Sequence, residues 1–335
     1  MIADLRSDTF TRPTPEMLQF MMQAPIGDDV YGEDPSVAEL ERKMADMFGM
    51  DDAIFCPSGT MTNQIGIKLL TQPMEEIICD KNSHIQIYEG GGIAYNSLIS
   101  SKLIDGDRGM ITAEQVEAAI NPDDLHQPIS KIVALENTMN KGGGAIYDME
   151  EIRKIAAVCE KHSLHLHLDG ARLFNALVVT NDSPKEYGRL FKTISVCLSK
   201  GLGAPIGSVL LFNGIPRIKA VRLRKVMGGG MRQAGLIASA GTYALDHHVE
   251  RLKDDHRRAK QLANALKEAA FVEDMYPVET NIVIFKVKNS AEMVKTLAEK
   301  GVKCITFSPV HVRMVTHLDF TDDMLEHTLQ AIHSI

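Results

Sequence analysis

Short apolar runs alternate with amphipathic segments of helical length along most of this chain, and this alternation limits its possible folds more than any other feature. Residues 148–161 carry apolar side chains at spacings of three and four, which is typical of a helix with one buried face. Residues 164–168 then alternate leucine with histidine, as a strand does. Strands separated by such helices form βαβ units, so the pattern predicts an α/β fold with a mainly parallel central sheet and flanking helices.

The pattern changes near residue 245, which predicts a second and smaller domain. A long helix is expected across residues 235–267, and strands and helices are mixed beyond it. We therefore expect a large domain over residues 1–245 and a C-terminal α+β domain over residues 246–335, onto which the N-terminal segment could also pack. The expected strands cover residues 53–55, 76–79, 131–135, 164–168, 194–198, 206–212, 280–286 and 312–316, and the expected helices include 61–70, 290–300 and 322–332.

Charge balance and cysteine content exclude several classes of protein. With 36 basic and 44 acidic residues the formal net charge is −8, which disfavours nucleic-acid binding, because such binding needs a surface that neutralises phosphates. No stretch approaches the roughly 20 apolar residues of a membrane span, and the first ten residues predict neither a secretory signal nor a transit peptide. Five widely spaced cysteines predict reduced thiols in a cytoplasmic protein, and no motif predicts a metal site.

The strongest local signal is a lysine that ends an apolar strand and precedes a glycine-rich turn. Lys200 follows the expected strand 194–198, and Gly201 and Gly203 come directly after it. Burying an unpaired ammonium is costly, whereas glycines let the backbone approach a bound group closely. A lysine in this setting is suited to forming a Schiff base with a carbonyl cofactor. Taken alone, the motif also fits a surface lysine at a strand end.

A second signal is a carboxylate at the end of another expected strand. Asp169 follows residues 164–168 and precedes Gly170, Ala171 and Arg172. Ligands bind at the carboxyl ends of parallel strands, so Asp169 and Lys200 are expected at the same edge of the sheet. A carboxylate beside the ring nitrogen of pyridoxal 5′-phosphate (PLP) keeps that nitrogen protonated, and the protonated ring acts as an electron sink. Taken alone, Asp169 is equally suited to capping a helix.

A third signal opens the expected helix 61–70. Ser58, Gly59 and Thr60 supply backbone N–H groups and two hydroxyls at the positive end of the helix dipole, which together suit a phosphate group. Hydroxyl residues at helix starts are usually caps, so this signal gains weight only beside Lys200 and Asp169. No GxGxxG motif lies between an expected strand and helix, which disfavours a nicotinamide enzyme.

Together these motifs resemble the fold-type I PLP-dependent enzymes and, more narrowly, the low-specificity and L-allo-threonine aldolases of the β-eliminating lyase superfamily. The resemblance runs in order through nearly the whole chain and is weakest around residues 100–130 and 245–300. The set of motifs is specific, although no single motif is. The matching segments are residues 4–9, 13–14, 27–35, 56–63, 136–138, 169–172, 199–207, 224–233 and 313–317.

The resemblance implies PLP as the cofactor and a role for each chemical group around it. Lys200 would form the Schiff base, and Asp169 would pair with the ring nitrogen. His84 would stack on the ring and take the proton of the substrate's β-hydroxyl. The reaction implied is the cleavage of L-threonine or L-allo-threonine to glycine and an aldehyde, which is a carbon–carbon lyase activity. The phosphate would be held by Ser58, Gly59 and Thr60.

The resemblance also implies how the substrate and a second subunit take part. Ser7, Arg172 and Arg313 would bind the α-carboxylate of the amino acid, because a planar guanidinium matches a carboxylate at two points. Tyr31 would reach the substrate from a neighbouring subunit, and Lys225 and Arg232 would reach the cofactor, which Arg172 also contacts. The chain is therefore expected to form a homo-oligomer with shared active sites, a tetramer built as a dimer of dimers.

One position departs from the family pattern. The family commonly has Glu-Asn-Thr-His-Asn where residues 136–140 of this chain have Met139 in place of the histidine, which in the resembled enzymes lies near the β-substituent. A thioether does not transfer a proton. Met139 therefore favours an alternative, a β-eliminating lyase or another fold-type I enzyme acting on a different amino acid. A non-catalytic binding protein is a third alternative, which the presence together of Lys200, Asp169, Arg172 and Arg313 disfavours.

Overall fold

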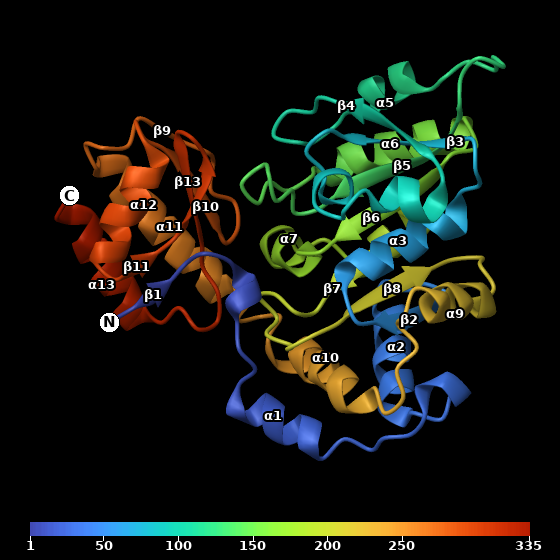
Figure 1. Ribbon diagram of the computed structural model, residues 1–335, viewed down its shortest axis with the longest axis horizontal. Helices are drawn as coiled ribbons and strands as arrows, with labels where there is room; N and C mark the ends of the chain where they lie inside the picture. The colour runs from blue at the N-terminus through green and yellow to red at the C-terminus, as the bar shows by residue number, and fades with distance from the viewer.

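The computed structural model describes residues 1–335 and confirms the α/β architecture (Figure 1). A larger lobe holds a seven-stranded sheet, and a smaller lobe holds a four-stranded antiparallel sheet together with both chain termini. No helix in the chain combines the length and the apolar character that crossing a membrane requires.

The large sheet is parallel except for one strand. Its order is β2-β8-β7-β6-β5-β3-β4, and β8 runs antiparallel to both of its neighbours. The carboxyl ends of the other six strands therefore meet at one edge. The strands are β2 (Asp52–Cys56), β3 (Glu75–Asp80), β4 (Ser100–Ile104), β5 (Ile129–Glu136), β6 (His165–Gly170), β7 (Thr193–Cys197) and β8 (Ser208–Phe212).

Helices cover both faces of this sheet, so alternate strand residues enter two separate apolar cores. Leu166 and Leu168 belong to the core that includes α2, α6 and α8, whereas Ile132 and Ala134 belong to the core on the α3 side. The helices of this lobe are α1 (Pro15–Met22), α2 (Pro35–Phe48), α3 (Gly59–Leu70), α4 (His84–Ile87), α5 (Ala113–Ala119), α6 (Met149–Lys161), α7 (Leu173–Thr180), α8 (Pro184–Leu190), α9 (Arg217–Val226) and α10 (Gly235–His247).

The small lobe packs its own helices on an antiparallel sheet of order β12-β13-β10-β9. Its core is a separate cluster that includes Phe285, Leu297 and Met314. The elements are α11 (Leu252–Glu268), β9 (Asp274–Met275), β10 (Ile282–Lys286), α12 (Ser290–Glu299), β11 (Val302–Lys303), β12 (Ile305–Ser308), β13 (His311–Val315) and α13 (Asp322–His333).

The expectation of one helix across residues 235–267 is wrong. The chain forms α10 and α11, with a break at residues 248–251. At the break, the His248 ring bonds the carbonyl of Leu202 (2.7 Å). The break lets α10 pack against α1 and α2 in the large lobe while α11 packs against β10 and α13 in the small one. The predicted boundary at residue 245 falls inside α10 and stays a prediction.

The N-terminal segment joins both lobes. Its first strand, β1 (Ala3–Asp4), pairs in parallel with β11 of the small lobe, and Val315 donates a hydrogen bond to the carbonyl of Leu5. The chain then crosses to the large lobe, where α1 packs against α10. This crossing carries Ser7 and Asp8 past the carboxyl edge of the large sheet.

Candidate active site

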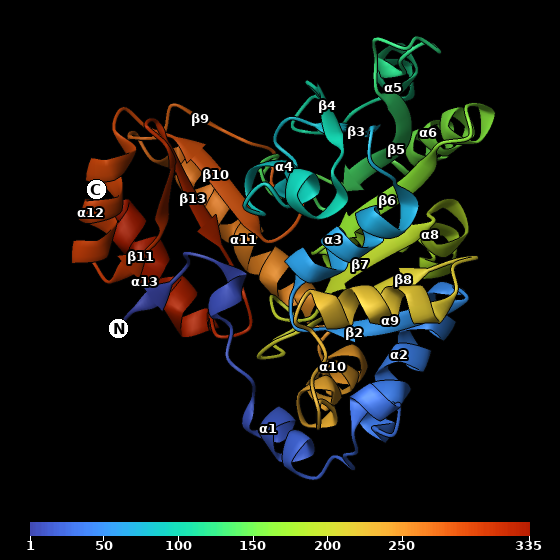
Figure 2. The same cartoon turned by 45° about the vertical axis from the view of Figure 1, so that its right-hand side comes forward.

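The carboxyl edge of the large sheet gathers most of the chemically distinctive residues of the chain. The arrowheads of β5 and β6 point toward the small lobe, so this edge faces the seam between the lobes (Figure 2). Register places Asp169 of β6 beside Glu136 of β5 and Ser195 of β7. The segments that leave this edge carry the predicted site residues Ser58, Gly59, Thr60, His84 and Lys200.

Lys200 lies just beyond β7, in a turn that the N–H of Gly203 closes on the Lys200 carbonyl (2.8 Å). Gly203 has φ +79°, a backbone conformation that favours glycine. The Lys200 side chain is half-buried and lines a small cavity together with Arg172 and Cys197. The glycine-rich turn therefore presents the amine toward the seam between the lobes.

The start of α3 offers donors for a phosphate. The Ser58 hydroxyl accepts a hydrogen bond from the N–H of Met61 (3.2 Å) and thereby caps the helix, which leaves the N–H groups of Gly59 and Thr60 at its open end. The hydroxyl of Ser208 is buried without a hydrogen-bond partner and lies 3.5 Å from the place of a Cβ on Gly59. Sequence reasoning missed Ser208, which follows a glycine and carries no motif of its own.

Asp169 is buried and held in place by two donors. Its Oδ2 accepts from the Asn63 amide (3.0 Å), and its Oδ1 accepts from the N–H of Ala171 (3.1 Å). PLP requires three groups from a protein, and all three are present here. A buried carboxylate suits its ring nitrogen, an amine beyond the next strand suits its carbonyl, and an open helix start suits its phosphate. The residues present therefore fit PLP.

A buried histidine sets the orientation of the Asn63 amide. Burial lowers the pKa of His167 to about 4, so its ring is neutral at neutral pH. One ring nitrogen bonds the Thr193 hydroxyl (2.8 Å), and the other lies 3.2 Å from Asn63 Oδ1. Asn63 Nδ2 therefore faces the two carboxylates of Asp169 and Glu89. The sequence had indicated only that His167 lies on a strand and Asn63 in a motif.

His84 begins α4 and pairs with a buried carboxylate that sequence reasoning did not assign. His84 Nδ1 lies 2.9 Å from Glu89 Oε1, which also accepts from Asn63. Burial alone would lower the pKa of His84, but its hydrogen bond to the Glu89 carboxylate and the charges of Asp169, Glu89 and Glu136 raise that pKa above its ordinary value. The His84 ring is therefore a candidate acid or base.

Glu136 fixes the two loops beside His84. One of its carboxylate oxygens accepts from the N–H of His84 (2.7 Å), and the other accepts from the N–H of Asn140 (2.9 Å). Burial and the nearby charge of Asp169 raise its pKa to about 7. Three carboxylates, of Glu89, Glu136 and Asp169, and the imidazole of His84 thus share this small region.

Arg172 forms a buried ion pair that the sequence did not predict. Its Nε and Nη2 each lie 2.7 Å from a carboxylate oxygen of Asp8, and both side chains are buried. Burial would raise the pKa of Asp8, but Arg172 and the charge of Lys200 hold that pKa well below its usual range. Ser7 lies next to this pair and bonds Thr9. The predicted role of Arg172 in substrate binding stays a prediction.

Arg313 is the guanidinium at this edge that has no carboxylate partner. Its Nη1 donates to Asn140 Oδ1 (3.1 Å) and its Nη2 to the carbonyl of Arg6 (3.3 Å), while its buried Nε has no partner. Burial and the neighbouring charge of Arg172 lower its pKa to about 10. A positive group with an unused donor is suited to binding an anion.

Other predicted residues lie apart from this edge. Tyr31 is 76% exposed, Lys225 is exposed on α9, and Arg232 pairs with Asp28 (3.0 Å). No hydrogen bond or ion pair within the chain joins these three side chains to Lys200 or Asp169. Their predicted place at a neighbouring subunit's site stays a prediction.

Met139 is 1% exposed and lies against the backbone of Gly109 and Gly142. The side chain that replaces the family histidine thus fills a packed turn.

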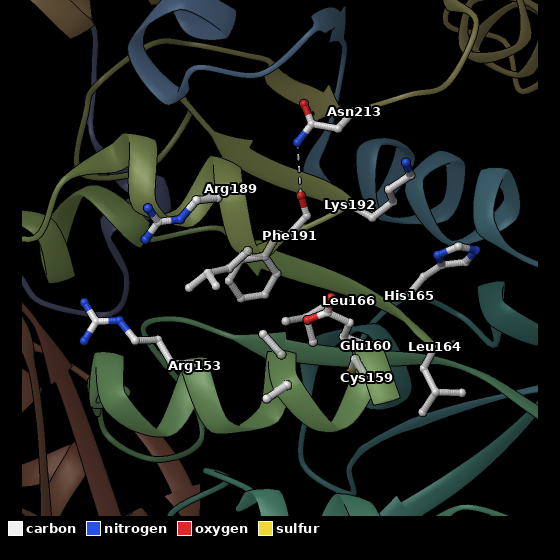
Figure 3. A pocket seen from close by; sticks show the side chains of 13 residues that line it. Arg153, Cys159, Glu160, Leu164, His165, Leu166, Arg189, Phe191, Lys192 and Asn213 are labelled. Atoms are coloured by element: carbon white, nitrogen blue, oxygen red, sulfur yellow. Dashed lines mark hydrogen bonds between the residues drawn. The ribbon is translucent and has the colours of Figure 1, made fainter. Parts of the chain in front are cut away.

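A separate cavity of about 520 Å³ lies between α6 and α8, at the amino ends of β6 and β7 (Figure 3). Arg153 and Arg189 line one side of it, and His165 and Lys192 line the other. Arg153 is already paired with Glu186. This cavity is at the opposite edge of the sheet from Lys200 and has no part in the candidate site.

Comparison with known proteins agrees with this geometry. The sequence profile of the family described as Beta-eliminating lyase matches residues 4–290. The low specificity L-threonine aldolase of Escherichia coli (strain K12) is 40% identical over 325 residues, which cover 96% of this chain and 96% of that protein. The probable low-specificity L-threonine aldolase 2 of Arabidopsis thaliana is 37% identical over 342 residues, which cover 99% of this chain and 96% of that protein.

A solved structure of threonine aldolase from Leishmania major has the same fold, with a TM-score of 0.86 at 22% identity over 99% of each chain. The chain therefore belongs to the β-eliminating lyase family, in the group that contains the low-specificity L-threonine aldolases.

Proposed function

We propose that this chain is a PLP-dependent aldolase that cleaves L-threonine, L-allo-threonine and related 3-hydroxy-2-amino acids to glycine and an aldehyde. The observation that carries the proposal is the meeting, at one sheet edge, of the Lys200 amine, the Asp169 carboxylate and the open start of α3. PLP held by these three groups supplies an electron sink for the bond that breaks at the substrate's Cα.

The chain's own residues bind the substrate and move its proton. Arg313 holds the α-carboxylate through its unused Nε, and this fixes which bond to Cα is aligned for cleavage. Neutral His84 takes the proton of the β-hydroxyl, and the Glu89 carboxylate stabilises the imidazolium that forms. His167 and Asn63 keep the Asp169 carboxylate in position.

The pH dependence of the reaction tests the pairing of His84 with Glu89. Because the neutral imidazole is the base, activity falls as pH drops below the pKa of His84. Glu89→Gln removes the charge that raises this pKa but keeps an oxygen acceptor for Asn63. We expect the acid limb of the kcat/KM profile to move to lower pH.

A surface pair of the same kind provides the control. Glu117 lies 2.8 Å from His162 on the exposed side of the molecule, so Glu117→Gln should leave the profile unchanged. An acid limb that stays in place in Glu89→Gln would show that His84 is not the base.

Product analysis tests the reaction itself and separates it from the alternative, β-elimination. Purified enzyme loaded with PLP is given L-threonine, L-allo-threonine and L-serine. We expect equimolar glycine and acetaldehyde from the first two. Release of 2-oxo acid and ammonia in their place would assign the chain to the eliminating lyases. The packing of Met139 against Gly109 supports the aldolase, because it keeps the thioether in a turn.

The assembly and location of the enzyme are part of the same proposal. We place the exposed side chains of Tyr31, Lys225 and Arg232 at the site of a neighbouring subunit, in a tetramer built from two dimers. All five cysteines are buried free thiols, which supports a cytoplasmic enzyme.

A further inference from the structure

The loop beside the candidate site carries a cation that no carboxylate neutralises. Lys141 is half-buried in the loop after β5, and none of the chain's salt bridges includes it. Its Nζ lies 4.4 Å from the ring centroid of Phe307 and 5.5 Å from that of Tyr88. Phe307 belongs to β12 of the small lobe and Tyr88 to the large lobe, so the ammonium is held across the seam by two aromatic faces.

Two short series of contacts connect this ammonium to the groups that bind substrate. In one direction, Asn140 is its chain neighbour and accepts a hydrogen bond from Arg313 (3.1 Å). In the other direction, the Tyr88 ring lies 5.5 Å from the His84 ring. The two residues proposed to bind the α-carboxylate and the β-hydroxyl, Arg313 and His84, are therefore each linked to Lys141 through one intermediate residue.

We infer that Lys141 is a specificity-determining residue that binds a carboxylate on the β-carbon of the substrate, so that 3-hydroxyaspartate is a preferred substrate class. The inference rests on the proposed aldolase function. Two unpaired cations, Arg313 and Lys141, match the two carboxylates of such a substrate. Threonine has a methyl group on its β-carbon where 3-hydroxyaspartate has its second carboxylate. A half-buried ammonium between two rings forms a stronger pair with a carboxylate than one fully in water.

The cleavage of this substrate needs no further reactant. The Cα–Cβ bond breaks, the β-hydroxyl loses its proton to His84 and becomes the aldehyde carbonyl, and Cα gains a proton. The products are glycine and glyoxylate, and no oxidant or reductant is consumed.

A lysine-to-methionine exchange tests the inference, because methionine keeps the apolar stem between the rings and loses the charge. For Lys141→Met we expect kcat/KM for 3-hydroxyaspartate to fall roughly 10- to 100-fold, mainly through KM, while kcat/KM for L-threonine stays within about twofold. Lys141→Arg should restore most of the preference. L-Aspartate has no β-hydroxyl and cannot be cleaved in this way, so its dissociation constant, measured by calorimetry on the holoenzyme, should rise by a similar factor in Lys141→Met.

Lys131→Met is the matched control, since Lys131 is half-buried near the amino end of β5, away from the site. It should change neither measurement. Equal loss for 3-hydroxyaspartate and threonine in Lys141→Met, or a wild type that prefers β-phenylserine to 3-hydroxyaspartate, would overturn the inference. A wild-type enzyme that forms no glycine from any substrate would instead overturn the proposed function.

Discussion

Replacing Lys200 with alanine is expected to reduce aldol cleavage by at least about 10³-fold, because the substitution removes the only amine presented by the turn after β7. The variant should still bind PLP through Asp169 and the start of α3, but without a covalent bond. Borohydride reduction followed by peptide mass spectrometry checks this directly. The wild-type peptide containing Lys200 should gain the mass of the reduced cofactor.

Lys192 provides a control at the other end of β7. It directly precedes that strand and lines the cavity at the opposite sheet edge, so Lys192→Ala should retain activity and the modified Lys200 peptide (Figure 3). Cleavage of threonine at the wild-type rate by Lys200→Ala, or a reduced cofactor bound to another lysine, would contradict the assignment.

Asp169→Ala should impair both cofactor binding and turnover. Asp169 is buried, and removing one member of a buried charge pair typically costs about 3–5 kcal/mol. The change also leaves the Asn63 amide with one acceptor fewer. We expect the dissociation constant of PLP to rise by at least about 10²-fold, with a further loss in kcat once the variant is saturated. Equilibrium dialysis and steady-state assays at high PLP measure the two effects separately.

Asp80→Ala separates cofactor binding from folding. Asp80 is also buried at the carboxyl edge and also accepts two hydrogen bonds, in its case from the N–H groups of Asn82 and Gly106. Its removal should lower Tm but leave PLP affinity per folded molecule close to that of the wild type. If Asp169→Ala bound PLP as tightly as Asp80→Ala does, Asp169 would not be the partner of the ring nitrogen.

The sequence predicted six of the seven strands of the large sheet, all except β4, and the edge at which the candidate site residues gather, because both depend on local patterns. Each strand can be recognised from a stretch of about ten residues, and so can each of the motifs around Lys200, around Asp169 and at the start of α3. The alternation of leucine and histidine predicted the strand but left the burial of its histidines open, and His167 is fully buried. A sheet covered by helices on both faces has no solvent side, so alternation there does not indicate exposure.

The remaining site contacts join residues far apart in the chain, and no local pattern predicts them. Asp8 and Arg172 are separated by 164 positions, and Asn63 and Asp169 by 106. The break between α10 and α11 was missed for a related reason. It contains no glycine or proline, and it forms because the two helices pack in different lobes.

The short crossing of the N-terminal segment has a mechanical consequence. Leu5 is bonded to both Lys303 and Val315 of the small lobe, while Asp8 is locked onto Arg172 of the large lobe. Three residue steps extend to at most about 10 Å. This segment therefore limits how far the two lobes can separate. A larger separation requires the loss of either the backbone hydrogen bonds of Leu5 or the buried ion pair between Asp8 and Arg172.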